Sequence, residues 1–448
     1  MRLLGIGVAL VGIAACFSKP VFQGAPDDGR AGEAGGEAGV PGALPSVTSS
    51  GLGVADPITI TTPDLVMVIP QGTVGMPSSL KIDDTEVLGR AGTCGDEDRV
   101  GVAVYPAISV TANAALWPVA GMAPTSTPSV TDVGPAFVHV SLSWSNGQYT
   151  CGGTQTASGL TAFTVFPDGR IIRDDRILPV TTGLPLEGGP SMPCGCNNST
   201  FGYFLTSFIS LDNTAFSRAV YENQSSAITV DPLTDITEDA ATDDDNPEWA
   251  CFEKSTTGTP VRRVGVVWTQ PLATQNNGTR MKRNNDSVTT LIYDWIHGGN
   301  TVAMGTYTTQ TAWFVDGGSD ATCDATVMNA LRRSFTSPRR MDIGTTSARG
   351  TVITLDPSTG IYHSTQSTAS PTWHVGVETG AIDGVPAGFA LSLRFPTSVQ
   401  PRVTRDGVAL IDGTDYRYQK TTGATPVTHS WWFAAALGKD AVLGFDQP

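Results

Sequence analysis

Alternating apolar and polar positions run along much of the chain and predict β-strands. Residues 137–144 read FVHVSLSW, and the runs 162–166 and 170–173 flank a Pro-Asp-Gly turn at 167–169. A two-residue period indicates a strand with one buried face, and such a turn between two runs predicts a hairpin. Asn146-Gly147 suits a type I′ turn after the first strand. The middle of the chain is therefore expected to form antiparallel sheet.

Similar runs predict strands further along the chain. A strand is expected over 203–211, and 289–296 is expected to pair with 301–315 as a long hairpin around the turn 297–300. Few intervals are long enough for the crossover helices that a parallel sheet needs. Beyond a boundary placed near residue 340, short strands with regularly spaced turns are typical of a small sandwich.

The sequence therefore predicts an all-β fold with few helices. We expect a large antiparallel β-sandwich domain over 56–340, which contains disulfides, and a smaller C-terminal Ig-like β-sandwich over 341–448. The composition agrees, because 50 Gly, 30 Pro and only 15% charged residues suit strands joined by many turns better than charged amphipathic helices.

One helix is expected between a cap at Asp324 or Thr326 and Pro338. The apolar residues near helical spacing are Val327, Met328, Leu331 and Phe335. A basic cluster follows them, formed by Arg332, Arg333, Arg339 and Arg340. These cations either complement the negative end of the helix or form an anion contact.

The charge balance bears on the partners of the protein. The chain has 448 residues, of which 42 are acidic and 27 basic, so its formal charge is -15. Affinity for a polyanion depends on clustered Lys and Arg. Nucleic acid is therefore not an expected partner.

The first sixteen residues form a signal pattern. Arg2 precedes a short apolar run, and Ile13-Ala14-Ala15 leads into Cys16. The run is too short to span a membrane, which takes about 20 apolar residues. The pattern resembles the signal of bacterial lipoproteins, which implies a lipid anchor on Cys16 in the outer membrane or at the cell surface. An ordinary secretion signal cut near Ala15 is the alternative, and it would leave Cys16 as a free thiol.

Residues 17–55 are expected to form a disordered tether. The stretch 24–42 consists mainly of Gly, Ala, Pro, Asp and Glu, with almost no large apolar side chain. Such a segment cannot bury enough surface to offset its ordering entropy. As a random coil the tether would span on the order of 30 Å. A helical spacer is the alternative, which the glycines disfavour.

The remaining cysteines are even in number, and in an exported chain this favours three disulfides. They are Cys94, Cys151, Cys194, Cys196, Cys251 and Cys323. Their spacing leaves the pairing open, although a bond between Cys194 and Cys196 would close a strained ring. The alternative is a metal site that takes two thiolates from Cys194 and Cys196.

An acidic run over 235–248 contains Asp243, Asp244 and Asp245. Carboxylate oxygens gathered in a turn can bind calcium, although the EF-hand pattern is missing. A solvated loop without an ion is the alternative. No other cofactor is expected.

Recognisable catalytic motifs are missing from the sequence, including the G-x-S-x-G elbow, the H-E-x-x-H zinc helix, the P-loop and the Rossmann glycine pattern. The remaining catalytic candidates are His297, Glu248, His374 and Glu378. His297 can act as a general base if a distant carboxylate orients it. The alternative is a turn histidine in water.

Three tryptophans, Trp373, Trp431 and Trp432, are candidates for stacking on sugar rings. The alternative is that they pack in a sandwich core. Neighbouring strand residues point to opposite faces, so one of Trp431 and Trp432 is expected to be buried and the other more exposed.

Residues 163–171, FTVFPDGRI, resemble hairpins of large carbohydrate-active β-sandwich proteins. No catalytic residue carries over from this resemblance. The expected function is a cell-envelope lipoprotein that displays a β-sandwich module for binding a glycan or a protein partner. The alternative is a secreted glycan-active hydrolase or lyase with its site in the larger sandwich.

Overall fold

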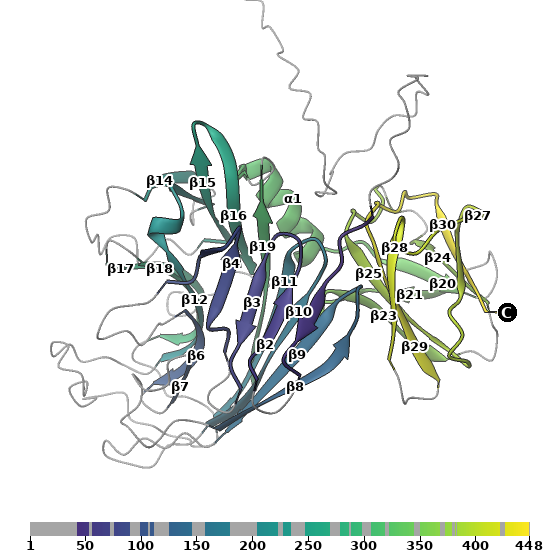
Figure 1. The fold of residues 1–448 in the computed structure, drawn as a ribbon, viewed down its shortest axis with the longest axis horizontal. Helices are drawn as coiled ribbons and strands as arrows, with labels where there is room; N and C mark the ends of the chain where they lie inside the picture. The colour runs from purple at the N-terminus through teal and green to yellow at the C-terminus, as the bar shows by residue number, and fades with distance from the viewer. Residues whose placement is uncertain are drawn as a thin grey trace, which may run out of the picture.

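The computed structural model describes residues 43–52, 56–71, 76–89, 99–105, 108–111, 125–145, 157–179, 204–222, 227–233, 247–268, 278–285, 288–297, 306–318, 322–344, 350–367, 372–378, 381, 383–421 and 426–447. Figure 1 shows a larger β domain beside a smaller C-terminal one, drawn in yellow-green. Among these residues, no helix is long and apolar enough to cross a membrane.

A nine-stranded antiparallel sheet, the central sheet, organises the larger domain. Its strands, in spatial order, are β14 (Ile228–Pro232), β13 (Arg218–Glu222), β15 (Trp249–Thr256), β16 (Thr259–Trp268), β19 (Tyr307–Gly317), β11 (Arg170–Pro179), β10 (Ala157–Val165), β9 (Val138–Ser145) and β8 (Thr125–Val133). The predicted hairpin at 162–173 is confirmed, because β10 and β11 pair on either side of Gly169. Gly169 has a φ of +79°, which the turn requires.

Two smaller sheets pack on one face of the central sheet, its inner face, and enclose one large hydrophobic core. The N-terminal sheet has strands β1 (Thr48–Ser50), β2 (Ile58–Thr61), β3 (Val66–Ile69), β4 (Ser79–Ile82) and β5 (Thr85–Glu86) in that order. The side sheet has the order β17 (Gly278–Asn285), β18 (Val288–His297), β12 (Phe204–Asp212), β6 (Val100–Tyr105) and β7 (Ile108–Thr111).

The smaller domain consists of two sheets around a second core. One has the order β21 (Thr351–Ile353), β20 (Met341–Gly344), β24 (Thr372–Val377), β30 (Val442–Asp446), β26 (Arg402–Arg405) and β27 (Val408–Ala409). The other has the order β22 (Leu355–Asp356), β23 (Ile361–Ser367), β25 (Phe389–Phe395), β29 (Val427–Phe433) and β28 (Tyr416–Lys420). The predicted all-β class with antiparallel, sandwich-like domains is confirmed.

The predicted helix is also confirmed as α1 (Ala325–Thr336). Its cap is Asp324, whose Oδ1 accepts the N–H of Thr326 at 2.7 Å. Met328, Leu331 and Phe335 are buried against the outer face of the central sheet, over β13, β15 and β16.

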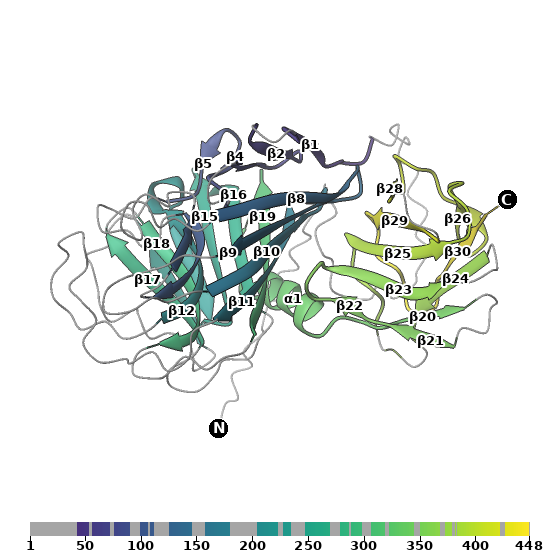
Figure 2. The same cartoon turned by 90° about the horizontal axis from the view of Figure 1, so that it is seen from below.

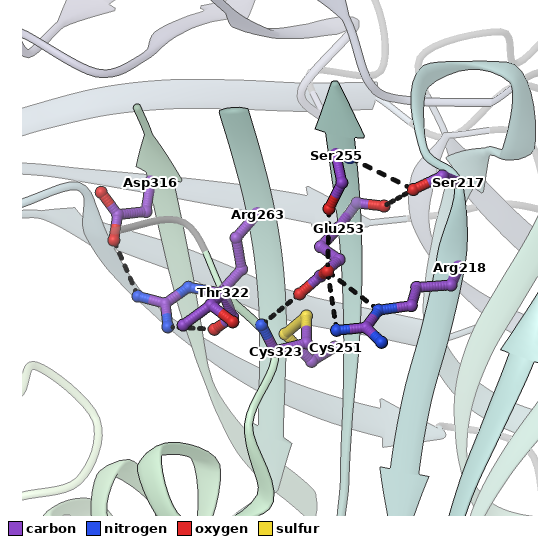
Figure 3. Close-up of a disulfide and its surroundings, with 9 residues drawn as sticks. All are labelled: Ser217, Arg218, Cys251, Glu253, Ser255, Arg263, Asp316, Thr322 and Cys323. Carbon is purple, nitrogen blue, oxygen red and sulfur yellow. Dashed lines mark hydrogen bonds and ion pairs between the residues drawn. A yellow bond between two sulfur atoms is a disulfide. The ribbon is translucent and has the colours of Figure 1, made fainter. Parts of the chain in front are cut away.

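A disulfide fixes the start of α1 to the central sheet (Figure 3). It joins Cys251 on β15 to Cys323, just before the helix cap. The buried Glu253 carboxylate accepts the N–H of Cys323 and the guanidinium of Arg218. A cross-link between cysteines 72 positions apart removes chain entropy from the unfolded state, equivalent to about 4 kcal/mol. The other four predicted disulfide cysteines, Cys94, Cys151, Cys194 and Cys196, lie outside the described residues.

The two domains meet along a seam that has its own apolar cluster. Gly360 has a φ of +71°, and a Cβ there would lie 2.6 Å from the Ile172 side chain of the larger domain. Gln419 Oε1 accepts the N–H groups of Ala136 at 3.1 Å and Phe137 at 3.0 Å. Backbone contact and buried apolar surface therefore hold the domains together.

Two sequence expectations differ from the structure. Residues 289–296 and 301–315 do not pair as a hairpin, because β18 lies in the side sheet while β19 pairs with β11 and β16 in the central sheet. The folded region also starts before residue 56, since β1 is paired with β2 and Val47 is buried in the core. Local turn signals do not determine which strand becomes a neighbour.

A buried ion pair on β11 of the central sheet bonds across the core to the side sheet. Arg173 Nε lies 2.8 Å from Asp175 Oδ2, with the two side chains 2% and 0% exposed. Asp175 also accepts the hydroxyls of Thr161 at 2.7 Å and Ser207 at 2.6 Å. The two terminal nitrogens of Arg173 donate to backbone carbonyls of β12 and β6 at 2.7 and 2.6 Å. The pair and its hydrogen bonds thus link four strands, β10 and β11 of the central sheet and β12 and β6 of the side sheet.

Replacing Asp175 with Ala should destabilise the protein by about 3–5 kcal/mol, because Arg173 would remain buried without its counter-charge. Urea unfolding measures this change. The control is Asp383→Ala, which removes a largely exposed ion pair to Arg339 and should cost at most about 1 kcal/mol. Equal costs for the two variants would contradict the role given to Asp175.

Candidate functional site

The outer face of the central sheet has three zones. α1 covers β13, β15 and β16. The smaller domain packs over Phe137, Phe166 and Ile172, and Figure 2 shows β22 of that domain beside α1 at the seam. Beyond the seam, most outward side chains of β9, β11 and β19 are polar, while β10 presents Thr164 followed by the apolar Ala162 and Leu160. This third zone is the candidate functional site.

Strand register brings these polar side chains together. His139 on β9 pairs with Thr164 on β10, and in the next row Asp174 on β11 pairs with Gln310 on β19. Cross-strand partners share one face of a sheet, so these groups face the same way. We call the set the polar strip, and its members are His139, Ser141, Thr164, Asp174, Arg176 and Gln310.

Asp174 organises the half of the strip furthest from the seam. Its Oδ2 lies 2.7 Å from Arg176 Nε, and its Oδ1 accepts Gln310 Nε2 at 2.6 Å. Burial raises the pKa of Asp174, while the hydrogen bonds from Gln310 and Arg176 oppose this rise. Arg176 is 49% exposed. The carboxylate therefore orients a guanidinium whose far end faces solvent.

Two histidines, one from each domain, lie at the half of the site that is nearest the seam. His139 Nδ1 lies 2.8 Å from Thr164 Oγ1. Across the seam, His363 Nε2 lies 3.1 Å from Thr359 Oγ1 and 4.0 Å from Asp356 Oδ2. His363 lies on the same side of β23 as Ile361, which is buried in the seam cluster.

The same charges act on both imidazoles. Burial lowers the pKa of His139 and of His363, while Asp132 and Asp356 oppose this fall at both histidines. Asp132 lies on β8 opposite His139 of β9, and Asp356 lies on β22 of the smaller domain, so charges from both domains act on each histidine. Among the described residues, no cluster of three or more His, Cys, Asp or Glu side chains is arranged to hold a metal ion.

The turn of residues 356–360 positions the side chains that the smaller domain contributes to the site. Asp356 Oδ1 accepts the N–H of Ser358 at 2.9 Å, and the Gly360 N–H bonds the carbonyl of Asp356 at 2.7 Å. Gly360 then packs on Ile172, next to Thr164 in the same strand row. The Asp-Pro-Ser-Thr-Gly sequence thus folds a tight turn that fits against the central sheet.

The site can bind a ligand rich in hydroxyl groups. Its solvent-reachable groups are the Ser141 hydroxyl, the Gln310 amide, the Arg176 guanidinium and the two imidazoles, which include both donors and acceptors, while Thr164 and Asp174 are buried. The neutral imidazoles can also accept a proton from a bound molecule.

The catalytic candidates from the sequence do not converge on this site. Glu248 forms an ion pair with Arg332 of α1 at 2.6 Å, and Glu378 pairs with Arg340 at 3.1 Å. His374 lies half-buried on β24 of the smaller domain. His297 ends β18, and its side chain lies outside the described residues.

The basic cluster near α1 is largely neutralised. Arg332 pairs with Glu248, Arg339 with Asp383 and Arg340 with Glu378. These ion pairs favour the structural interpretation of the cluster over an anion contact.

The tryptophan candidates are all buried. Trp373 is 2% exposed, and Trp431 and Trp432 are each 0% exposed. The expectation that one of the adjacent pair would be exposed is wrong, because β29 is covered on both sides. Trp431 lies in the core of the smaller domain and Trp432 in the seam cluster.

Two other predicted sites lie outside the described residues. They are the proposed calcium ligands Asp243, Asp244 and Asp245, and the lipidation residue Cys16.

No motif in the sequence identifies the polar strip. A usable signal was present in residues 170–176, RIIRDDR, which place charged residues inside a predicted strand. Charged side chains are rarely buried without a partner, so such a run indicates paired or functional groups. The contribution of His363 and Asp356 was not predictable locally, because it depends on how the domains dock.

The comparisons with known proteins assign no family. No family model matches the chain, and no curated protein matches it. A heparan sulfate lyase mutant from Pedobacter heparinus matches with a TM-score of 0.32 and 8% identity, over 74% of this chain and 41% of the lyase. The chain therefore spans less than half the length of that lyase.

Two epimerase structures show similar scores. Galactose 1-epimerase from Lactobacillus acidophilus NCFM has a TM-score of 0.31 and 8% identity, over 62% of this chain and 99% of the epimerase. A putative aldose 1-epimerase from Klebsiella pneumoniae has a TM-score of 0.32 and 8% identity, over 65% and 87%. The resemblance to carbohydrate-active β-rich enzymes is thus distant, and it gives no activity.

Acid should destabilise the protein through His139 and His363. The pKa values of His139 and His363 are lowered on folding, so the unfolded chain binds protons first as the pH falls. Their contribution to stability should be complete above about pH 6.5 and decrease below it. Urea unfolding across this pH range, compared with His139→Gln and His363→Gln, measures the effect.

A third histidine serves as the comparison for this prediction. His429 is fully buried between the Tyr418 hydroxyl and the Thr397 carbonyl, and burial lowers its pKa too. The double variant His139→Gln, His363→Gln should therefore keep part of the acid sensitivity. An NMR titration that places His139 or His363 above about pH 6.5 would contradict the assignment.

Proposed function

We propose that this protein is a lipid-anchored cell-envelope protein that binds a glycan in the polar strip beside the domain seam. The observation that carries the proposal is the set of oriented donors and acceptors around Asp174, with a half-exposed Arg176 at its edge. Saccharide hydroxyls both donate and accept hydrogen bonds, and this mixture matches them.

Rigidity of the site supports this proposal. The strip residues lie on neighbouring strands of the central sheet, and their mutual hydrogen bonds fix several side chains before a ligand arrives. A site of this kind loses little conformational entropy on binding. The buried tryptophans leave recognition to polar groups rather than to stacking on these rings.

The anchor part of the proposal depends on the sequence. Ile13-Ala14-Ala15-Cys16 matches the signal of bacterial lipoproteins, and residues 17–42 join Cys16 to the described structure. Because no Asp follows the cysteine, we propose the outer membrane or cell surface as its location. A protein partner at the strip, in place of a glycan, is the other binding function that we consider.

One observation favours an enzyme as the second candidate function. His139 and His363 come from different domains, and Asp132 and Asp356 act on both of them. Neutral imidazoles near a bound glycan could transfer protons, as its hydrolysis or elimination requires. New reducing ends in saccharides incubated with the protein would identify such an enzyme, and His139→Gln should then abolish their formation.

Replacing Arg176 with Gln should weaken glycan binding about tenfold or more, because a hydrogen bond from a charged group contributes about 1.5–3 kcal/mol. Calorimetric titration with a panel of soluble neutral and acidic oligosaccharides measures this. The matched control is Arg218→Gln, since Arg218 is 42% exposed and also pairs with a buried carboxylate, Glu253.

Figure 3 shows Arg218 beside Glu253, and their strands β13 and β15 belong to the same sheet as the strip but lie apart from its strands β9, β10, β11 and β19. The Arg218→Gln variant should bind saccharides as tightly as the unmodified protein does. If no saccharide in the panel binds, or if Arg218→Gln weakens binding as much as Arg176→Gln, glycan binding at the strip is wrong.

Replacing Cys16 with Ser should release the protein from the membrane fraction, because the proposed lipid can no longer be attached. Fractionation of cells that produce each form, followed by mass spectrometry of the N-terminus, tests this. Continued membrane association of the Ser form would show that Cys16 is not the anchor.

A further inference from the structure

Two leucines lie beside Arg176 on the outer face of the central sheet, where the polar strip ends. Leu160 on β10 is directly opposite Arg176 on β11, and Leu178 is two residues beyond Arg176 on the same strand. Leu178 is 44% exposed and Leu160 is half-buried. We call Leu160 and Leu178 the leucine pair. It adds an apolar surface to a site that is otherwise described by polar groups.

The neighbours of each leucine fix its direction. Thr161 points inward, where its hydroxyl donates to Asp175, and Ile177 is buried in the large core. Successive strand residues point to opposite faces of a sheet. Leu160 and Leu178 therefore point outward, on the same face as the guanidinium.

The guanidinium beside the leucine pair is held in place. The Asp174 side chain is 2% exposed, and its Oδ2 lies 2.7 Å from Arg176 Nε while its Oδ1 accepts Gln310 Nε2 at 2.6 Å. Directly opposed residues on paired strands have Cβ atoms about 5 Å apart, as applies to Leu160 and Arg176. An oriented charged donor and an apolar surface thus lie within reach of one small chemical group.

Hydroxyl groups flank the leucine pair. Ser143 on β9 pairs with Leu160, and Ser158 on β10 pairs with Leu178. Ser143 is exposed and Ser158 is half-buried. Because a hydroxyl both donates and accepts hydrogen bonds, this end of the strip combines an apolar surface, a charged donor and neutral acceptors.

We propose that the leucine pair and Arg176 form a subsite for the acetamido group of an N-acetylated amino sugar. This group carries a carbonyl, a methyl and an N–H at fixed positions. The carbonyl accepts from Arg176, the methyl packs on the leucine pair, and the N–H donates to the hydroxyl of Ser143 or Ser158. The proposal rests on glycan binding at the strip, as proposed above, and names the class of saccharide.

A carboxylate on the ligand would also pair with a guanidinium, but the surroundings favour a neutral group. Asp174 already neutralises Arg176, Asp132 and Asp356 add negative charge at the histidine half of the site, and the whole chain carries -15. These charges repel an acidic ligand. A carboxylate also has no methyl to bury on the leucine pair.

Calorimetric titration of the protein with chitotetraose and with cellotetraose tests the proposal. The two tetrasaccharides share one backbone and differ in carrying an acetamido group or a hydroxyl group on each ring. Chitotetraose should bind about tenfold more tightly or better, because methyl burial and the amide hydrogen bond both add to its affinity.

Leu178→Ser should lower the preference for chitotetraose about fourfold, which is the factor that burial of one methyl group contributes. Leu178→Met should keep the preference, and thermal unfolding of either variant should not change because the side chain is 44% exposed. The matched control is Val230→Ser. Val230 is 52% exposed and shares the outer face with its partner Val220, on the edge strand β14 of the same sheet. This control should keep the full preference.

Equal affinity for the two tetrasaccharides would overturn the acetamido subsite and leave glycan binding at the strip standing. The same conclusion would follow if an oligosaccharide of uronic acids bound more tightly than chitotetraose, or if other saccharides bound and neither tetrasaccharide did. An equal loss of preference in Leu178→Ser and Val230→Ser would also contradict the subsite. Absence of binding to every saccharide would instead overturn the proposed glycan function itself.

Discussion

The buried ion pair between Arg173 and Asp175 is the constraint on which the larger domain depends. It neutralises two charges inside the core and ties β11 to the side sheet through β12 and β6. Strand alternation then requires Asp174 and Arg176 to point to the outer face. Four consecutive charged residues thus form both the cross-link inside the core and the charged end of the polar strip. Shifting the pairing register of β11 by one residue would turn Arg173 and Asp175 to the outer face and bury Asp174 and Arg176 instead.

The rest of the outer face is occupied by elements from later in the chain. α1 is fixed by the disulfide of Cys251 and Cys323 over one end of the strands, and the smaller domain covers the middle. Polar side chains remain in the strip beyond the seam and beside the start of α1, where Arg218 pairs with Glu253 and Arg263 with Asp316 (Figure 3). The docking of the smaller domain also brings Asp356 and His363 to His139. The site is therefore a product of domain docking as much as of the central sheet.

Local sequence patterns predicted the elements better than their neighbours. The 162–173 hairpin and α1 follow from turn, cap and spacing signals within a few residues. The neighbours of β19 do not follow from local signals, because its pairing with β11 and β16 depends on burial across distant segments. Alternation correctly placed Trp431 and Trp432 on opposite faces, but only the seam with the larger domain buries Trp432. For the same reason, the cross-domain part of the candidate site had no local signal.

The segment before β1 lies between the proposed lipid anchor and the proposed glycan site. Leu44 and Pro45 bond the smaller domain at Gly413 and Arg417, while the Val47 N–H bonds the carbonyl of Pro135 in the larger domain at 3.4 Å. A force on the proposed tether would therefore act on both domains at their seam. A glycan bound between the strip and His363 would contact both domains as well. Ligand and anchor would thus act on the same set of domain contacts, which the buried seam cluster and the Gln419 hydrogen bonds hold in place.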